Sequence, residues 1–240
     1  MRVTKIWVRL LILATGLVVP VLMLVYLLAA EQSGAIQFAA AERRGVEYHA
    51  PAWNVLRRMT EHRTLAAMVI SGNNDKRDAM LAKQREIDAA FVKLAETDAR
   101  LGEEMKTKEL LQGVESSWTA LKGRLGQNES MDLQALMAQY NQIVYDMGRV
   151  ITKMGNHSNL ILDPDIDTYY LMDATLVALP QTQDRLVGIE MLGQELLRSE
   201  KIGDAHRMKL AVAAALLKEA DVDRTMADVQ TSLNEDQNFN

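Results

Sequence analysis

An uncharged apolar run at residues 10–30 constrains this 240-residue chain more than any other feature. An α-helix rises about 1.5 Å per residue, so a helix of this length just crosses the hydrocarbon core of a bilayer. Pro20 lies inside the run, where we expect a kink, because a membrane helix tolerates one proline when neighbouring groups bond the freed carbonyl. The run therefore predicts a transmembrane helix.

Basic residues are distributed unequally around this predicted span. Arg2, Lys5 and Arg9 precede it, and no basic residue follows until Arg43. Short segments rich in Lys and Arg stay on the cytoplasmic side of a membrane. We therefore expect a cytoplasmic N-terminus at 1–9, a span in a bacterial inner membrane, and a periplasmic region that begins at residue 31 and continues to residue 240.

A cleaved signal peptide is the competing interpretation of the same run. The apolar region of a signal peptide is about 7 to 15 residues long, and this run is longer. Small residues suited to cleavage are also badly placed: Leu28 interrupts the pattern before Ala30, and the pair Ala39 and Ala41 lies well beyond the run. These observations favour an anchor that stays uncleaved.

The composition predicts an all-α fold. Aromatic residues make up 5% of the chain and there are 4 prolines, while long stretches consist of Ala, Leu, Glu, Gln, Lys and Arg, which favour helices. The net charge is −5, so nucleic acid is not an expected partner. The absence of cysteine excludes disulfides, thiolate metal sites and cysteine nucleophiles.

Turn residues and apolar periodicity divide the exported region into helices. Helical composition continues from the span as a stalk to Gly45, and Pro51 suits the first turn of a new or resumed helix. Gly72 suits the residue after that helix, and Gly102 and Gly155 suit two later helix ends. The expected helices are 51–71, 74–102, 104–125, 132–155, 163–199 and 204–233, where Asn74, Ser130 or Asp132, and Asp163 are candidate N-caps.

The last two helices carry specific expectations. Asp163, Pro164 and Asp165 form the clearest helix start in the chain. Pro180 falls inside the helix that follows and predicts a kink near Leu179. The final helix has apolar residues in heptad register, which predicts that they form its buried seam: Met208, Val212, Ala215, Val222, Met226, Val229 and Leu233.

Apolar residues at steps of three and four predict buried seams on two of these helices, at Leu111, Val114, Trp118, Leu121 and Leu125 and at Leu133, Tyr140, Ile143, Met147, Val150 and Met154. The elements together predict an up-and-down helical bundle that follows the membrane helix, either as one bundle or as two stacked bundles. The final helix ends in mid-pattern before a polar tail at 234–240, which favours a chain truncated at its C-terminus.

No pattern predicts catalysis, a metal or a cofactor. None of the four histidines has a Glu three positions before it, as di-iron sites in bundles require. Asp163, Asp165 and Asp167 imitate the start of a calcium loop, but its sixth position is Thr168 and its twelfth is Ala174. Helix capping therefore explains these aspartates, and we do not expect an enzyme.

A basic cluster stands out in the acidic exported region, at Arg57, Arg58, His62 and Arg63. Arg63 falls in the apolar register of its helix, and an arginine that points into a bundle needs an anion. That anion is either an internal carboxylate or a ligand. If it is a ligand, Arg63 is the principal binding residue, and Arg58, His62 and Tyr170 are weaker candidates.

Several segments resemble a known family. They are GVEYHAP at 45–51, EHR at 61–63 and, above all, SNLILDPDIDTYYLMD at 158–173. They resemble the exported helical sensor regions of bacterial transmembrane receptors, chiefly methyl-accepting chemotaxis proteins and related sensor kinases. A weaker similarity, at 62–72 and 84–88, is to the nitrate- and nitrite-sensing helical domain, although Thr64 stands where that family usually has Gly.

The resemblance implies signal transduction, most simply in chemotaxis, by a homodimer that binds a small anion such as a carboxylate or nitrate. It also implies a second membrane helix, a linker domain of the HAMP type and a signalling module. A membrane-anchored structural or assembly protein that binds another protein through its bundle is the alternative. A further apolar span encoded downstream would favour the receptor.

Overall fold

The computed structural model describes residues 2–126, 132–162, 165–198 and 202–236. Within these ranges the chain is helical and has no strand, which confirms the all-α prediction. The chain divides into two compact units, Met1–Glu42 and Arg43–Asn240, which we describe separately.

The first unit consists of the N-terminal part of α1 (Arg2–Ile70). Its large apolar side chains from Ile6 to Leu28 are exposed, and the helix continues through Pro20. By length and composition this helix could cross a membrane, which agrees with the predicted span.

The second unit contains the rest of α1, and here the structure corrects the predicted break between Gly45 and Pro51. The helix is continuous through both residues. Pro51 cannot donate a backbone hydrogen bond, but Tyr48, Ala52 and Val55 around it are almost completely buried, so packing holds the helix together. Gly45 is needed because a Cβ there would overlap the side chain of Ser158 at the end of α4 (Leu133–His157).

The turn after α1 matches the prediction in one respect and differs in another. Gly72 has a φ of 98°, and the amides of Gly72 and Asn73 donate to the carbonyls of Val69 and Met68, as in a Schellman motif. Asn74 does not cap an α-helix, however. It begins a short 3-10 turn, η1 (Asn74–Lys76), and no side chain caps the α2 helix (Arg77–Met105) that follows.

Gly102 lies inside α2 rather than at its end, because Lys106 takes the left-handed conformation that closes this helix. A Cβ on Gly102 would overlap the carboxylate of Asp98. That carboxylate is buried and accepts hydrogen bonds from Tyr48 Oη at 2.7 Å and from Thr107 Oγ1 at 2.6 Å. The glycine thus leaves room for a buried polar cluster that ties α1 to the end of α2.

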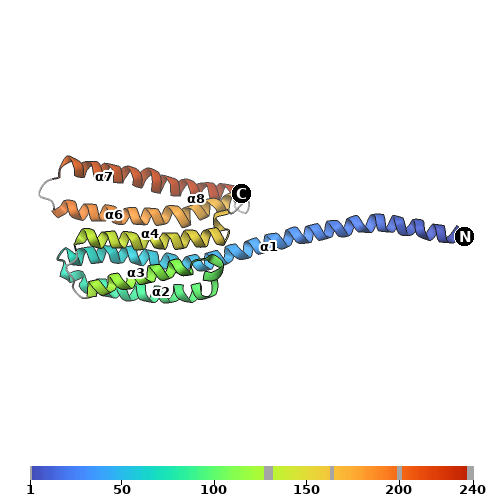
Figure 1. Cartoon of the computed structure of the whole chain (residues 1–240). Coiled ribbons are helices and arrows are strands. Elements are labelled where there is room, and N and C mark those ends of the chain that lie inside the picture. The colour runs from blue at the N-terminus through green and yellow to red at the C-terminus, as the bar shows by residue number, and fades with distance from the viewer. Residues whose placement is uncertain (1, 127–131, 163–164, 199–201, 237–240) are drawn as a thin grey trace. The chain divides into compact units, whose positions relative to one another are not determined.

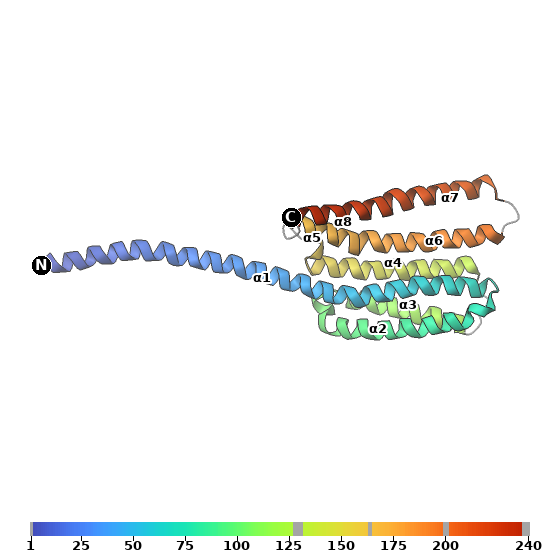
Figure 2. The same cartoon turned by 180° about the vertical axis from the view of Figure 1, so that it is seen from behind.

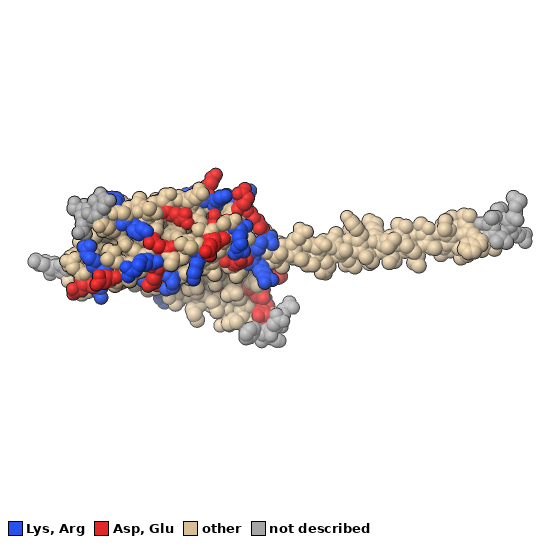
Figure 3. Space-filling view, turned by 90° about the horizontal axis from the view of Figure 1, so that it is seen from below, with Lys and Arg blue, Asp and Glu red and all other residues tan. Residues whose placement is uncertain are grey.

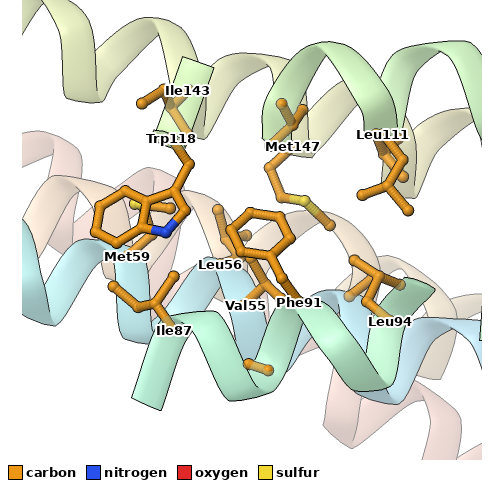
Figure 4. Close-up of a cluster of buried hydrophobic side chains, with 14 of the residues drawn as sticks. Val55, Leu56, Met59, Ile87, Phe91, Leu94, Leu111, Trp118, Ile143 and Met147 are labelled. Carbon is orange, nitrogen blue, oxygen red and sulfur yellow. The ribbon is translucent and has the colours of Figure 1, made fainter. Parts of the chain in front are cut away.

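One apolar core is shared by the helices α1, α2, α3 (Lys108–Gly126) and α4. The predicted seams of α3 and α4 are buried except for Leu125 and Leu133, which are half-buried. Figure 4 shows Trp118 of α3 pointing toward Met59 of α1, while Phe91 of α2 and Met147 of α4 point toward each other beside Leu56. Asp132 precedes α4 without a side-chain capping bond, and Ser130 lies outside the described residues.

The second half of the unit forms two more antiparallel rods, each interrupted by a π-helical segment. A 3-10 turn, η2 (Leu160–Leu162), follows α4. The first rod is α5 (Ile166–Met172), η3 (Asp173–Ala178) and α6 (Leu179–Arg198), and the second is α7 (Asp204–Leu216), η4 (Leu217–Asp223) and α8 (Arg224–Glu235). Figures 1 and 2 both show α6 beside α4, with α7 and α8 on the far side of α6.

Pro180 lies next to one of these π-segments, close to where the kink was expected. It is the second residue of α6, directly after η3. A π-segment changes the hydrogen-bond register by one residue and so accommodates a missing N–H group. Asp163 and Pro164 lie outside the described residues, and Asp165 stands at the N-cap of α5 without a side-chain capping bond.

The predicted seam of the last helix is wrong, because its residues are exposed. The side of η4 and α8 that faces the protein instead carries buried acidic groups. Arg185 Nε donates to Asp221 at 2.5 Å, and Arg224 makes a bidentate pair with Asp173 at 2.7–3.0 Å. Asp221 is completely buried, so the interface between the two outer rods contains buried charged groups.

Candidate functional site

A groove of about 1070 Å³ opens along α1, α4 and α6 of the second unit and contains Arg63. Its lining is partly apolar, from Ala67, Leu133, Met137 and Met191. Its polar groups come from different helices and are Arg63, Ser71, Asp132, Gln134, Asn141, Asp184, Gln194, Glu195 and Lys209.

Arg63 is held at this groove by two neighbouring helices. Its guanidinium donates to Asn141 Oδ1 of α4 at 2.8 Å and to Asp184 Oδ1 of α6 at 2.8 Å. Only 4% of the Arg63 side chain is exposed, whereas 52% of the Asp184 side chain is exposed. Arg63 Nε is buried and has no partner. The ion pair thus joins a buried cation to a carboxylate that water can reach.

This geometry bears on the two alternatives for Arg63. The prediction that it points into the bundle is confirmed by its burial. Its counter-ion in this structure is Asp184, the internal carboxylate of the first alternative. The groove as a whole carries one more negative than positive group, since Arg63 and Lys209 face Asp132, Asp184 and Glu195. An added anion would therefore have to compete with Asp184.

His62 is next to Arg63 in sequence but lies in the core rather than in the groove. Its ring is fully buried, Nδ1 bonds the hydroxyl of Tyr140, and its edge packs against Trp118 with ring centroids 5.2 Å apart. Burial lowers the pKa of His62 to about 3, so the ring is neutral near pH 7. A neutral, enclosed imidazole cannot supply charge to an anion in the groove.

Arg58 and Tyr170 also lie away from the groove. Arg58 faces α2, where its Nε is 3.5 Å from a carboxylate oxygen of Glu86. Tyr170 packs edge-on against Tyr169, with ring centroids 5.5 Å apart. Of the four candidate binding residues, only Arg63 therefore lines the groove.

Sequence reasoning missed a second groove, of about 1050 Å³, between α2, α3, α4 and the first π-segment. Its charged residues are Glu103, Lys106, Lys108, Glu109, Arg149 and Lys153, so basic groups outnumber acidic ones. These residues come from three helices and form no local motif. Figure 3 shows why such a cluster is hard to recognise, since Lys and Arg alternate with Asp and Glu over the visible face of this unit.

The described residues contain no group of three or more His, Cys, Asp or Glu side chains placed to hold a metal ion. A small molecule in the Arg63 groove can therefore be bound by the charge of Arg63 and by hydrogen bonds to Arg63, Asn141 and neighbouring polar groups.

In comparisons with known proteins, no family model, no curated protein and no solved structure matches this sequence.

Proposed function

We propose that this chain is the sensory part of a bacterial membrane receptor, in which the bundle binds a small anion at the groove beside Arg63. The observation that carries the proposal is the asymmetry of the ion pair: Arg63 is enclosed, while its partner Asp184 is half exposed. A guanidinium group suits planar oxyanions such as carboxylate or nitrate, because two parallel N–H groups can meet two oxygens.

In this mechanism Asp184 holds the place that the ligand takes. An anion that enters the groove bonds the guanidinium of Arg63, and the Asp184 carboxylate moves to water. Because Asp184 is on α6 and Arg63 on α1, the exchange removes a link between these helices. Such a differential contact is what a ligand needs in order to shift a population of conformations.

The anchor and the bundle have separate roles in this proposal. The apolar part of α1 spans the inner membrane with residues 1–9 in the cytoplasm, as the basic residues before it favour. The bundle then lies in the periplasm, where small anions reach it. The receptor acts as a homodimer and transmits the signal, most simply to chemotaxis.

Calorimetry on the full chain in detergent micelles tests the ligand site. We expect one or more members of a panel of organic acids, amino acids and nitrate to release or absorb heat with the wild type. We expect Arg63→Ala to lose this binding. The variant should stay folded, because the half-exposed Asp184 that it leaves behind can be hydrated.

Arg57→Ala is the matched control, since Arg57 is on the same helix and pairs with Glu61 on the surface at 2.5 Å. It should bind as the wild type does. If no anion binds the wild type, or if Arg63→Ala binds equally well, the ligand site is wrong and the Arg63–Asp184 pair is structural.

A membrane-anchored structural or assembly protein is the second candidate function. The observation in its favour is the exposed apolar side of α7 and α8, because large apolar patches on a soluble surface usually mark a binding site for another protein. This candidate predicts normal partner binding by Arg63→Ala, whereas the receptor proposal predicts loss of the ligand response.

A further inference from the structure

The rod formed by α7, η4 and α8 has apolar residues on its outward side and buried acidic residues on part of its inward side, the opposite of a helix packed in a soluble monomer. The residues turned toward the protein include Asp221 of η4 and Asp228 of α8, which are buried. The residues turned outward are mostly large and apolar, and between 37% and 69% of each is exposed: Met208, Val212, Leu216, Val222, Met226, Val229 and Leu233. We call these seven residues the outer stripe.

The outer stripe has the spacing of a helix that packs against another helix. Most of its members recur at intervals of three, four and seven residues from Met208 to Leu233, which is the pattern of a two-stranded seam. The described part of the chain offers no segment that covers the stripe, as the exposures show. Its natural complement is a helix with the same spacing.

The charged residues beside the outer stripe indicate which helix packs against it. Taking Val212 and Met226 as seam positions, the flanking positions on one side hold Asp204 and Lys218, and those on the other side hold Lys209 and Asp223. In a parallel pair of helices, a flanking residue lies beside the partner residue five positions further on. Asp204 then meets Lys209 of the second helix, and Lys218 meets Asp223. Glu219, the seam position midway between Val212 and Met226, meets the same residue of the second helix and is the like-charge contact of this register.

We propose that the outer stripe packs against the same stripe of a second copy of this chain, with equivalent helices parallel about a two-fold axis. The parallel orientation rests on the proposed function, because two chains anchored in one membrane run in the same direction. Lys218 and Asp223 pair within one chain at 3.0 Å and are 72% and 53% exposed, so both can reach a partner. A two-fold axis makes each contact twice.

Cysteine cross-linking of the full chain in the membranes of expressing cells tests this face. The sequence has no cysteine of its own, so every disulfide involves an introduced cysteine. In a parallel pair, identical seam positions meet. We expect Val212→Cys and Met226→Cys each to give a disulfide-linked dimer under mild oxidation. Ala214→Cys and Ala227→Cys, exposed positions that lie away from the seam, are the controls and should remain monomeric.

Each other result overturns the proposal. Equal cross-linking at all four positions indicates random collision. No dimer at Val212→Cys and Met226→Cys, while both cysteines still react with a maleimide, means that the stripe meets something else, such as another protein. Cross-linking only between Val212→Cys of one chain and Val229→Cys of another indicates an antiparallel pair. None of these results depends on anion binding, so the ligand site can fail or succeed separately.

Charge exchange provides a second measurement that within-chain pairing would not affect. Lys218→Asp alone and Asp223→Lys alone each oppose like charges in a homodimer. When the two variants are co-expressed with different tags, every flanking contact between them is complementary. We expect mixed dimers to exceed the one-half expected from random pairing, and a random distribution would contradict the parallel register.

Discussion

His62 and Arg63 are neighbours in sequence with opposite environments. Successive side chains on a helix point about 100° apart, so one enters the core beside Trp118 and the other reaches the groove at Asp184. The sequence pattern grouped both in one basic cluster and placed only Arg63 in the apolar register of the helix. It could not assign them different roles, because that depends on Tyr140 and Asp184, which lie far away in the chain.

The neutral state of His62 predicts a pH dependence of stability. The pKa of His62 is about 3 when folded and near 6.5 when unfolded, so between these values only the unfolded chain binds the proton. Stability should therefore fall as the pH drops from about 6.5 to 3. Protonation of His62 in the unfolded chain should lower the free energy of unfolding by roughly 3 kcal/mol at pH 4, relative to pH 7.

Urea unfolding of wild type and His62→Gln between pH 7 and pH 4 measures this contribution. Glutamine cannot be protonated, so the stability difference between the two chains should shrink or reverse as the pH falls. Parallel curves across that range would show that His62 is accessible to protons in the folded chain.

Helix boundaries in this protein depend on contacts that local signals do not contain. Pro51, Gly45, Gly102 and Gly155 all looked like helix ends, and all four lie inside helices. Gly102 is retained there because the Asp98 carboxylate occupies the space of a Cβ, and Gly155 because Ile161 Cδ1 would lie 2.9 Å from one. By contrast, Gly72 does end a helix: its φ of 98° is a left-handed conformation that glycine adopts without strain, so a glycine here is a local signal for a helix end.

A matched pair of glycine substitutions tests this explanation. Gly102→Ala should destabilise the bundle by about 1–3 kcal/mol, because the new methyl group displaces the buried Asp98. Gly113→Ala, on α3 with nothing within 4 Å of the added Cβ, should stabilise it by about 0.5–1 kcal/mol. Thermal or urea unfolding gives both values, and equal effects from the two changes would contradict a role for close approach at Gly102.

At the scale of the whole molecule, sequence reasoning predicted the fold class, an apolar N-terminal helix that could span a membrane, and the cores of α3 and α4. It failed for the last helix, where heptad spacing indicated a seam but not whether this chain or another one covers it. The second groove was missed for a related reason, since Lys106, Arg149 and Lys153 come together only after α2 and α4 have packed.

The central claim is that Asp184 occupies the position of an anionic ligand on Arg63, and one measurement tests it most directly. The affinity of the best-binding anion is compared between wild type and Asp184→Asn by calorimetry on the full chain in detergent micelles. Removing the tethered carboxylate removes a competitor, so the affinity should rise, on the order of tenfold for about 1.4 kcal/mol. An affinity for Asp184→Asn that is equal to or weaker than that of the wild type would contradict the account.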